Sequence, residues 1–460
     1  MMHTIRVWSA AALLSVACDG SATTSPPPAA EPDSELAEPA AAPEAEVLAA
    51  APATTPTTTP PATALAAAPP AKPKWKPRAD DPTTAEHPLE NPDALSYFYD
   101  SLARVDDGDK EVIQVVHLGA SMIGMDDLTS VLRGKFQTRF GDGGAGMVLL
   151  RRYMTNYLHR WVGLDAKKWD HCYIGYLCDK SGRYGLGGAV FYGKRGAETT
   201  IKTRKKELGD EVAHFEVWYA AEPGGARFAV QVDDAEPEVI DTRAETAEDR
   251  FHAIDVEQGP HKINMKVQGN GRVRGYGIVM ETEGPGITWD QFSMLGAFTK
   301  RMHGWDEAHI AGQIKHRDPE LVAFMYGGND LRRVSNGKLD QAQYAAEYLK
   351  GVKHVMAGKP EASCLIVGIT DRGRSLTFTI LPKHVAVIVE AQREVAKEAG
   401  CAFFDTWAAM GGGGSLRKWK NMKPPLAAKD LKHLNHAGRE VLGGWIYEAI
   451  MAGYAAHRAS

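Results

Sequence analysis

The chain has 460 residues, of which 44% are hydrophobic and 24% charged, as in an ordinary soluble globular protein with room for two or three domains. Its formal net charge is −5. With this balance no broadly basic surface is expected, so the composition gives no electrostatic reason to predict binding to nucleic acid.

The N-terminus predicts export. Residues 7–17 are almost wholly apolar, follow a single cation, Arg6, and end at Cys18. This run is too short to cross a bilayer as a helix, and we interpret residues 1–18 as a signal peptide. The sequence before Cys18 resembles the lipobox of bacterial lipoproteins, whose cysteine becomes the lipidated first residue. We therefore expect lipid anchoring to a bacterial cell membrane, periplasmic or on the outer surface; ordinary cleavage beside an incidental cysteine is the alternative.

A tether is predicted next, over residues 19–85. It is rich in Ala, Pro, Thr and Glu and nearly free of large apolar side chains up to about residue 70. Such a segment cannot bury enough surface to offset the entropy of ordering, so we expect a disordered spacer that holds the folded part away from the membrane.

The first part of an α/β domain is predicted over residues 86–155. An apolar strand at 112–118 ends in the small turn Gly119-Ala120, Ser121 follows, and helical spacing begins at Asp126. A serine at such a corner projects above the sheet edge near helix-terminal N–H groups, which suits a nucleophile; a helix-capping serine is the alternative. The glycine-rich stretch 141–146 follows a helix, which argues against a phosphate-binding loop. We expect it to pass close to the active site.

The sequence pattern changes over residues 156–284, where short runs of alternating apolar and polar residues are separated by polar turns. We predict strands at 198–204, 214–221, 227–234, 252–256, 263–267 and 273–281. This pattern indicates an inserted β-sandwich, which is a candidate carbohydrate-binding domain.

Predicted strands and helices alternate again over residues 285–460. We predict strands at 287–292, 321–326, 364–369 and 402–404, and helices at 341–355, 383–399 and 437–451. Strands that alternate with helices predict a doubly wound parallel sheet, with ligands at the carboxyl ends of its strands.

Four cysteines follow Cys18. In an oxidising compartment the candidate disulfides are Cys172–Cys178 and Cys364–Cys401. Their spacing does not predict a zinc site, and the one neighbouring histidine, His171 beside Cys172, is too little to form one.

Three further signals fall at predicted strand ends or before the last helix. Gly296 lies between a strand and a helix, Asn329 follows the strand at 321–326, and Asp430 precedes His433 by three residues. Each has a purely structural explanation: close packing for Gly296, a turn for Asn329, and loop hydrogen bonding for Asp430 and His433. Their joint occurrence with Ser121 points to one site.

In this order the residues resemble the four blocks of the SGNH (GDSL-type) serine hydrolases, over roughly residues 90–150 and 287–455. The usual Gly-Asp-Ser is here Gly119-Ala120-Ser121. The resemblance implies a flavodoxin-like three-layer fold and a triad of Ser121, His433 and Asp430. It also implies an oxyanion hole made by Ser121, Gly296 and Asn329, with no cofactor or metal.

Two rival assignments exist. Gly188 could replace Gly296, and His436 could replace His433 as the base. We favour Gly296 because it lies shortly before Asn329 at a strand-to-helix junction, and His433 because of its offset from Asp430.

A closer likeness is to the branch that contains peptidoglycan O-acetylesterases. It is carried by residues 117–119, 136–137, 140–144, 411–415 and 425–426, together with Trp419, and by the position of the insert between the first two blocks. Met122 stands where many members have histidine. The likeness implies hydrolysis of O-acyl esters, acetyl first among them, on a glycan such as peptidoglycan.

Three other functions compete with this one. An O-acyltransferase would use the same serine, and a non-catalytic glycan-binding lipoprotein would have a decayed first block. A metal-dependent phosphoesterase would need clustered ligands; Asp330, Asp371 and Asp405 lie near strand ends but lack a set of histidine partners.

Overall fold

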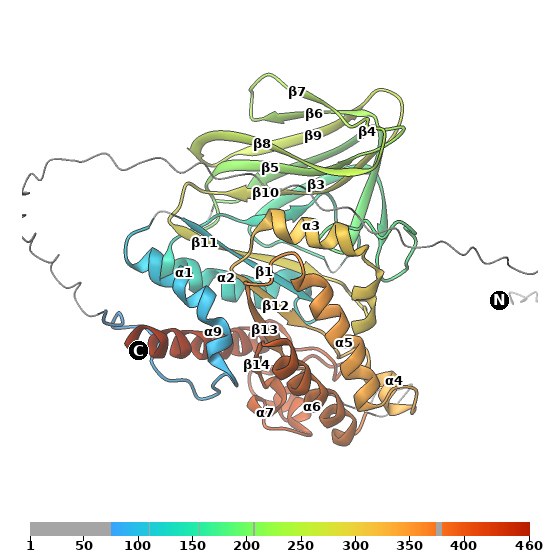
Figure 1. The fold of residues 1–460 in the computed structure, drawn as a ribbon. Coiled ribbons are helices and arrows are strands. Elements are labelled where there is room, and N and C mark those ends of the chain that lie inside the picture. The colour runs from blue at the N-terminus through green and yellow to red at the C-terminus, as the bar shows by residue number, and fades with distance from the viewer. Residues whose placement is uncertain (1–74, 110, 156, 206–207, 374–379) are drawn as a thin grey trace, which may run out of the picture. The chain divides into compact units, whose positions relative to one another are not determined.

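The computed structural model describes residues 75–460 except 110, 156, 206–207 and 374–379 (Figure 1). The predicted signal peptide, Cys18 and the tether as far as residue 74 lie outside the described residues. Where the predicted tether is described, it packs on the domain. Asp81 forms a buried ion pair with Arg139, and the ring of Trp75 lies 5.5 Å from that of Tyr454, edge to face.

A five-stranded parallel sheet forms the centre of the α/β part. Its strand order is β11-β1-β12-β13-β14. The strands are β1 (Val112–Gly119), β11 (Gly286–Ser293), β12 (Leu321–Met325), β13 (Ser363–Val367) and β14 (Ala402–Phe404). The chain begins near the middle of the sheet and builds outward in both directions, which is the flavodoxin-like order. The predicted doubly wound sheet is confirmed.

Helices cover both faces of this sheet (Figure 1). One face carries α1 (Ser96–Asp106), α2 (Asp127–Phe140) and α9 (His436–Ala459), and the other carries α3 (Glu307–Arg317), α5 (Gln341–Met356) and α6 (Pro382–Ala399). Successive side chains of β1 serve opposite layers, since Val115 packs with the first set and Val116 with the second. Three short helices complete the set: α4 (Leu331–Ser335), α7 (Thr406–Ala409) and α8 (Ser415–Asn421).

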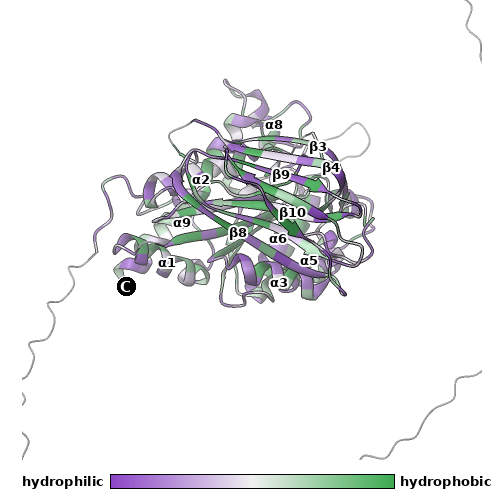
Figure 2. Ribbon diagram, turned by 90° about the horizontal axis from the view of Figure 1, so that it is seen from above, coloured by the Kyte–Doolittle hydropathy of each residue, from purple (hydrophilic) through white to green (hydrophobic). Residues whose placement is uncertain are grey.

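A nine-stranded antiparallel sheet forms the predicted inserted β domain. It contains β2 (Gly146–Leu149), β3 (Val162–Tyr173), β4 (Ala189–Thr203), β5 (Val212–Ala221), β6 (Arg227–Val232), β7 (Glu238–Asp241), β8 (Glu248–Gly259), β9 (Lys262–Gln268) and β10 (Val273–Glu281). The first half of β4 pairs with β10 and its second half with β9. One long strand thereby joins both parts of the sheet, which curls around a shared core. Hydrophobic and hydrophilic residues are interspersed along several of its strands (Figure 2).

The expectation for the glycine-rich stretch 141–146 is wrong. Asp142 bridges to Ile287, near the start of β11, whereas the carboxyl ends of the strands lie at the opposite edge of the sheet. A Cβ on Gly143 would lie 2.6 Å from the backbone of Ile287. The glycines therefore allow two backbone segments to pack closely, away from the predicted site.

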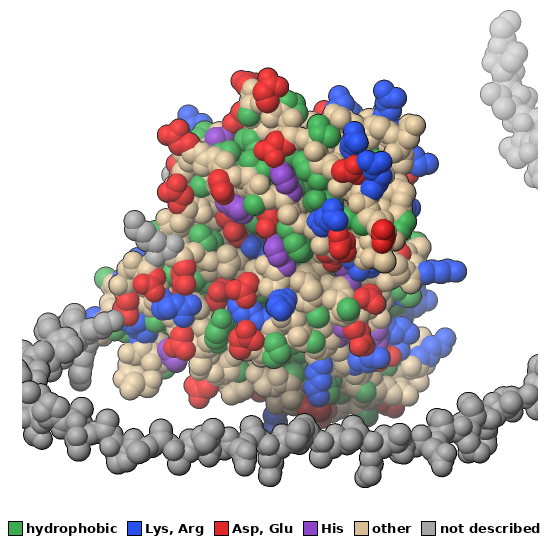
Figure 3. All heavy atoms as spheres, turned by 45° about the horizontal axis from the view of Figure 1, so that its top comes forward, with side chains coloured by type: hydrophobic (Ala, Val, Ile, Leu, Met, Phe, Trp, Pro, Cys, Tyr) green, Lys and Arg blue, Asp and Glu red, His purple; other side chains and the backbone are tan. Residues whose placement is uncertain are grey.

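Both candidate disulfides, Cys172–Cys178 and Cys364–Cys401, are present. Among the described residues, no helix has both the length and the apolar character needed to cross a membrane. Acidic, basic and apolar side chains are interspersed over the face seen in Figure 3, so no large surface of one charge sign dominates it.

Candidate active site

Ser121 lies in the turn that follows β1. Gly119, the last residue of that strand, has no room for a side chain, because a Cβ there would lie 2.9 Å from the carbonyl oxygen of Met325 on β12. The next residues turn sharply, with the N–H of Gly124 donating to the carbonyl oxygen of Ser121 at 3.2 Å. The N-cap of α2 is Asp126. Ser121 therefore does not cap this helix, and its hydroxyl is available for other contacts.

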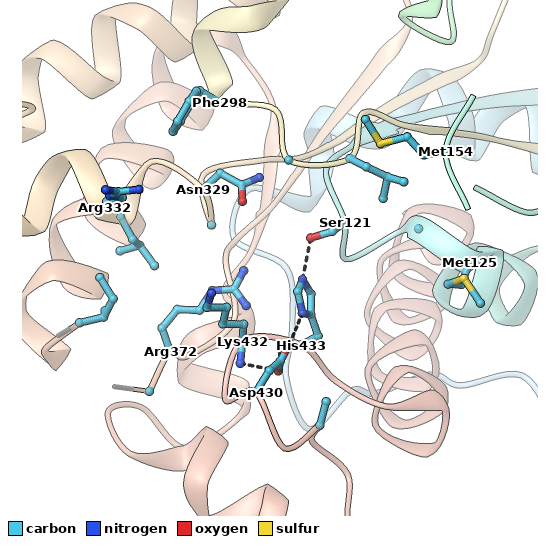
Figure 4. A pocket seen from close by; sticks show the side chains of 18 of the residues that line it. Ser121, Met125, Met154, Phe298, Asn329, Arg332, Arg372, Asp430, Lys432 and His433 are labelled. Carbon is cyan, nitrogen blue, oxygen red and sulfur yellow. Dashed lines mark hydrogen bonds and ion pairs between the residues drawn. The ribbon is translucent and has the colours of Figure 1, made fainter. Parts of the chain in front are cut away.

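A chain of hydrogen bonds joins Ser121, His433 and Asp430 (Figure 4). Ser121 Oγ lies 2.9 Å from His433 Nε2, and His433 Nδ1 lies 2.6 Å from Asp430 Oδ2. Because Asp430 accepts a hydrogen bond from Nδ1–H, Nε2 carries no proton and is left to accept the hydroxyl proton of Ser121. The other oxygen of Asp430 accepts the backbone N–H groups of Lys432 and His433, which fixes the carboxylate.

The pKa of His433 is lowered from its ordinary value. Burial is the main cause, the positive charge of Arg372 adds to it, and the hydrogen bond to Asp430 acts in the opposite direction. Burial also acts to raise the pKa of Asp430, but the hydrogen bonds from His433 and the backbone outweigh it, so that this pKa is lowered. At neutral pH the pair is thus a neutral imidazole beside a carboxylate, the state a general base requires.

Gly296 and Asn329 line the same cavity as Ser121, His433 and Asp430, a space of about 860 Å³. Asn329 Nδ2 donates to the carbonyl oxygen of Ala297 at 2.9 Å, which uses one of its two N–H bonds. Within the described residues, the backbone N–H groups of Ser121 and Gly296 donate to no other group. Three donors are therefore available around the serine.

The structure separates the favoured residues from their rivals. Gly188 does not line the cavity; a Cβ there would lie 2.9 Å from Met294 Sδ, so it is a packing glycine. His436 Nδ1 lies 3.1 Å from Asp127 Oδ1 and its Nε2 lies 3.3 Å from Glu440 Oε1, whereas the hydroxyl of Ser121 is hydrogen-bonded to His433.

The carboxylates considered for a metal site have other partners. Asp330 accepts the N–H and hydroxyl of Thr299, Asp371 accepts the N–H groups of Gly414 and Leu416, and Asp405 caps α7. Over the described part of the chain, no group of three or more His, Cys, Asp or Glu side chains is arranged to hold a metal ion.

Sequence reasoning missed two buried ion pairs beneath Ser121. Arg133 donates to both carboxylate oxygens of Asp126, and both side chains are fully buried. Arg439 pairs with Asp127 at 2.5 Å and reaches the carbonyl oxygen of Ser121 at 3.5 Å. Two adjacent aspartates at the start of the helix after Ser121 were the available signal. These pairs connect the serine turn to α2 and α9.

Sequence reasoning also missed Arg372, which follows β13 and lines the cavity. An arginine after a strand carries no sequence signal for this placement.

No protein-family model matches the sequence, and no curated protein matches it either. The structure is similar to a solved structure of a peptidoglycan O-acetylesterase, with a TM-score of 0.63 and 21% identity over 78% of this chain and 95% of that chain. It also matches a lipase/acylhydrolase from Enterococcus faecalis, with a TM-score of 0.28 and 18% identity over 36% of this chain and 77% of that chain. The first likeness confirms the expected α/β fold with its inserted β domain.

Proposed function

We propose that this protein is a serine esterase that hydrolyses O-acyl esters, with acetyl as the acyl group and a glycan such as peptidoglycan as the substrate. The observation that carries the proposal is the hydrogen-bonded chain Ser121–His433–Asp430, which opens on a cavity that also presents Gly296 and Asn329. A helix-capping serine or a structural histidine would not require this combination.

The reaction follows from the geometry. His433 Nε2 accepts the proton of Ser121 as the serine oxygen attacks the ester carbonyl, and Asp430 orients the imidazole and stabilises its charged form. The oxyanion is then bound by the N–H groups of Ser121 and Gly296 and by the side-chain amide of Asn329. His433 then gives the proton to the leaving alcohol, and water releases the acid from the acyl-enzyme by the reverse sequence.

Two observations favour a glycan as the substrate. The structurally similar protein with a TM-score of 0.63 is a peptidoglycan O-acetylesterase. In addition, the inserted β domain extends to the cavity, where Tyr176 is 71% exposed in a loop closed by the Cys172–Cys178 disulfide. An exposed aromatic ring held at the edge of an esterase site suits the apolar face of a sugar.

Export with a lipid anchor on Cys18 belongs to the same proposal. It rests on the N-terminal sequence and agrees with two disulfides, which persist in oxidising compartments. The partners of the protein would then be a membrane, through the lipid, and an extracytoplasmic glycan.

The test is release of p-nitrophenol from p-nitrophenyl acetate by the full chain in detergent. Ser121→Ala and His433→Ala should each lose the activity, whereas Ser335→Ala, a matched serine on α4 outside the cavity, should keep it. Activity that survives in Ser121→Ala would refute the esterase.

The substrate is tested separately, by acetate release from O-acetylated peptidoglycan. Transfer of acetyl to a glycan acceptor in place of release would favour the acyltransferase. Retention of glycan without any ester cleavage would favour the binding protein.

A further inference from the structure

Arg372 lies in the wall of the catalytic cavity, and no described residue forms an ion pair with it. It lines both the main cavity and a small hollow beside it, and in each case Ser121, Gly328 and Asn329 are also in the lining. The Arg372 side chain reaches toward the space between Asn329 and His433 (Figure 4).

The fold makes room for this guanidinium. A Cβ on Gly328 would lie 2.2 Å from Arg372 Nη2, so the side chain occupies space that only glycine leaves open. Nη1 is buried and has no hydrogen-bond partner among the described residues.

The neighbouring carboxylates are already engaged. Asp371 accepts Trp407 Nε1 and two backbone N–H groups, and Asp430 accepts His433 and two backbone N–H groups. Neither forms an ion pair with Arg372, and no other described carboxylate does so. The adjacent stretch 374–379 contains no Asp or Glu in its sequence.

Burial lowers the pKa of Arg372 to about 10, with Asp430 and Asp371 acting in the opposite direction. The guanidinium therefore keeps its charge at neutral pH. A half-buried cation that has no ion-pair partner among the described residues is costly in a folded protein, and the cost is offset when an anion binds.

Cationic side chains also outnumber carboxylates in the rest of the cavity wall. Among the described residues, the other cationic side chains in the lining are Arg332, Lys432 and Arg439, the last of which pairs with Asp127, and the lining contains one carboxylate, that of Asp430. The face seen in Figure 3 carries side chains of both signs.

We propose that Arg372 binds a carboxylate on the alcohol part of the ester, so that the preferred substrates are O-acylated sugar acids. The inference rests on the proposed esterase function and names its substrate class. A planar guanidinium matches the two oxygens of a carboxylate, and binding there would hold the ester next to Ser121.

The experiment compares acetate esters that differ in charge, with the full chain in detergent. The probes are 4-acetoxybenzoate, 4-acetoxyphenylacetate and 3-(4-acetoxyphenyl)propionate, each with its neutral carboxamide. For each pair, kcat/KM of the acid is divided by that of the amide. Comparing this ratio between variants cancels the intrinsic reactivity of the esters.

In at least one pair the ratio should fall by about ten- to a hundredfold in Arg372→Gln, the range expected for loss of a hydrogen-bonded charge pair. Arg372→Lys should lower the ratio less than Arg372→Gln does, because lysine keeps the positive charge but lacks the planar guanidinium that can donate to both carboxylate oxygens. Arg417→Gln removes an exposed arginine on α8, outside the cavity, and should leave the ratio unchanged.

An unchanged ratio in Arg372→Gln for all three pairs would overturn the inference, even if the mutation slows both esters equally. A wild-type protein that hydrolyses none of the six esters, nor p-nitrophenyl acetate, would instead count against the esterase itself. The two failures are thus distinguishable.

Discussion

Asn329 has two roles in the proposed site, and replacing it with alanine tests both. Its Nδ2 group donates to the carbonyl oxygen of Ala297, one residue beyond Gly296, and so connects β12 to the loop that carries the glycine. Its second N–H is available for the oxyanion. Asn329→Ala therefore removes one oxyanion donor directly and loosens the loop that holds another.

The expected loss follows from these two terms. Removal of a single oxyanion-hole donor costs roughly 3 to 4 kcal/mol of transition-state stabilisation, or about 10²- to 10³-fold in kcat. Loss of the hydrogen bond to Ala297 adds about 1 kcal/mol, which is another factor of about five. We expect kcat to fall by roughly 500- to 5,000-fold, with a much smaller change in KM, because the oxyanion exists only after attack.

The assay is steady-state hydrolysis of p-nitrophenyl acetate, with thermal unfolding measured to show that the variant is folded. Asn336→Ala is the matched control, since this exposed asparagine follows α4 and lies outside the cavity. A loss in Asn329→Ala below tenfold, or one expressed entirely in KM, would refute the assignment of Asn329 to the oxyanion hole.

Two predictions concern pH. Burial and the charge of Arg372 lower the pKa of His433, so kcat/KM for p-nitrophenyl acetate should decline only below about pH 6.5. Arg372→Gln should move this decline to higher pH, because it removes the positive charge. A decline at the same pH in the variant would contradict the electrostatic coupling between Arg372 and His433. Burial raises the pKa of Glu320 from 4.5 to about 7, so its contribution to stability is complete below pH 4.5 and is lost as the pH rises through 7. Between pH 4.5 and 7 the free energy of unfolding of the wild type should therefore fall by up to about 3 kcal/mol more than that of Glu320→Gln. Urea titration at a series of pH values measures both free energies. If they change in parallel with pH, Glu320 does not have this effect.

The parallel sheet could be predicted because each central strand is buried on both faces and so forms a short, continuous apolar run between turns. The inserted domain was harder to delimit. Much of β3 is exposed, and the left-handed backbone of Lys168 interrupts its pairing, so its sequence has no clean alternation. The last helix continues to Ala459, beyond the predicted end at 451. Its last turns are held by Tyr454, whose ring packs against Trp75 and whose hydroxyl donates a hydrogen bond to Asp106. Such tertiary contacts leave no local signal.

The candidate site was predictable to the extent that its residues lie at strand ends. Gly296, Ser121 and Asn329 follow β11, β1 and β12, which are neighbours in the sheet, so a correct topology brings them together. The glycine-rich stretch 141–146 shows the limit of this reasoning: sequence indicates close backbone approach but not at which end of the sheet. Arg372 shows another limit, since only the three-dimensional structure reveals whether an arginine has a partner.

The β domain is not a module on a flexible linker, and this bears on how it can affect the chemistry. Its core is continuous with the apolar side chains of α3, and Asp249 on β8 lies 2.6 Å from His309 on that helix. The described residues between 75 and 460 accordingly form one compact unit. The position of Tyr176 relative to Ser121 is therefore set by the same packing that positions the proposed catalytic residues. If the proposed glycan substrate binds at Tyr176, a substitution in the shared core alters its selection and the stability of the fold together, whereas a substitution of Tyr176 itself alters selection alone.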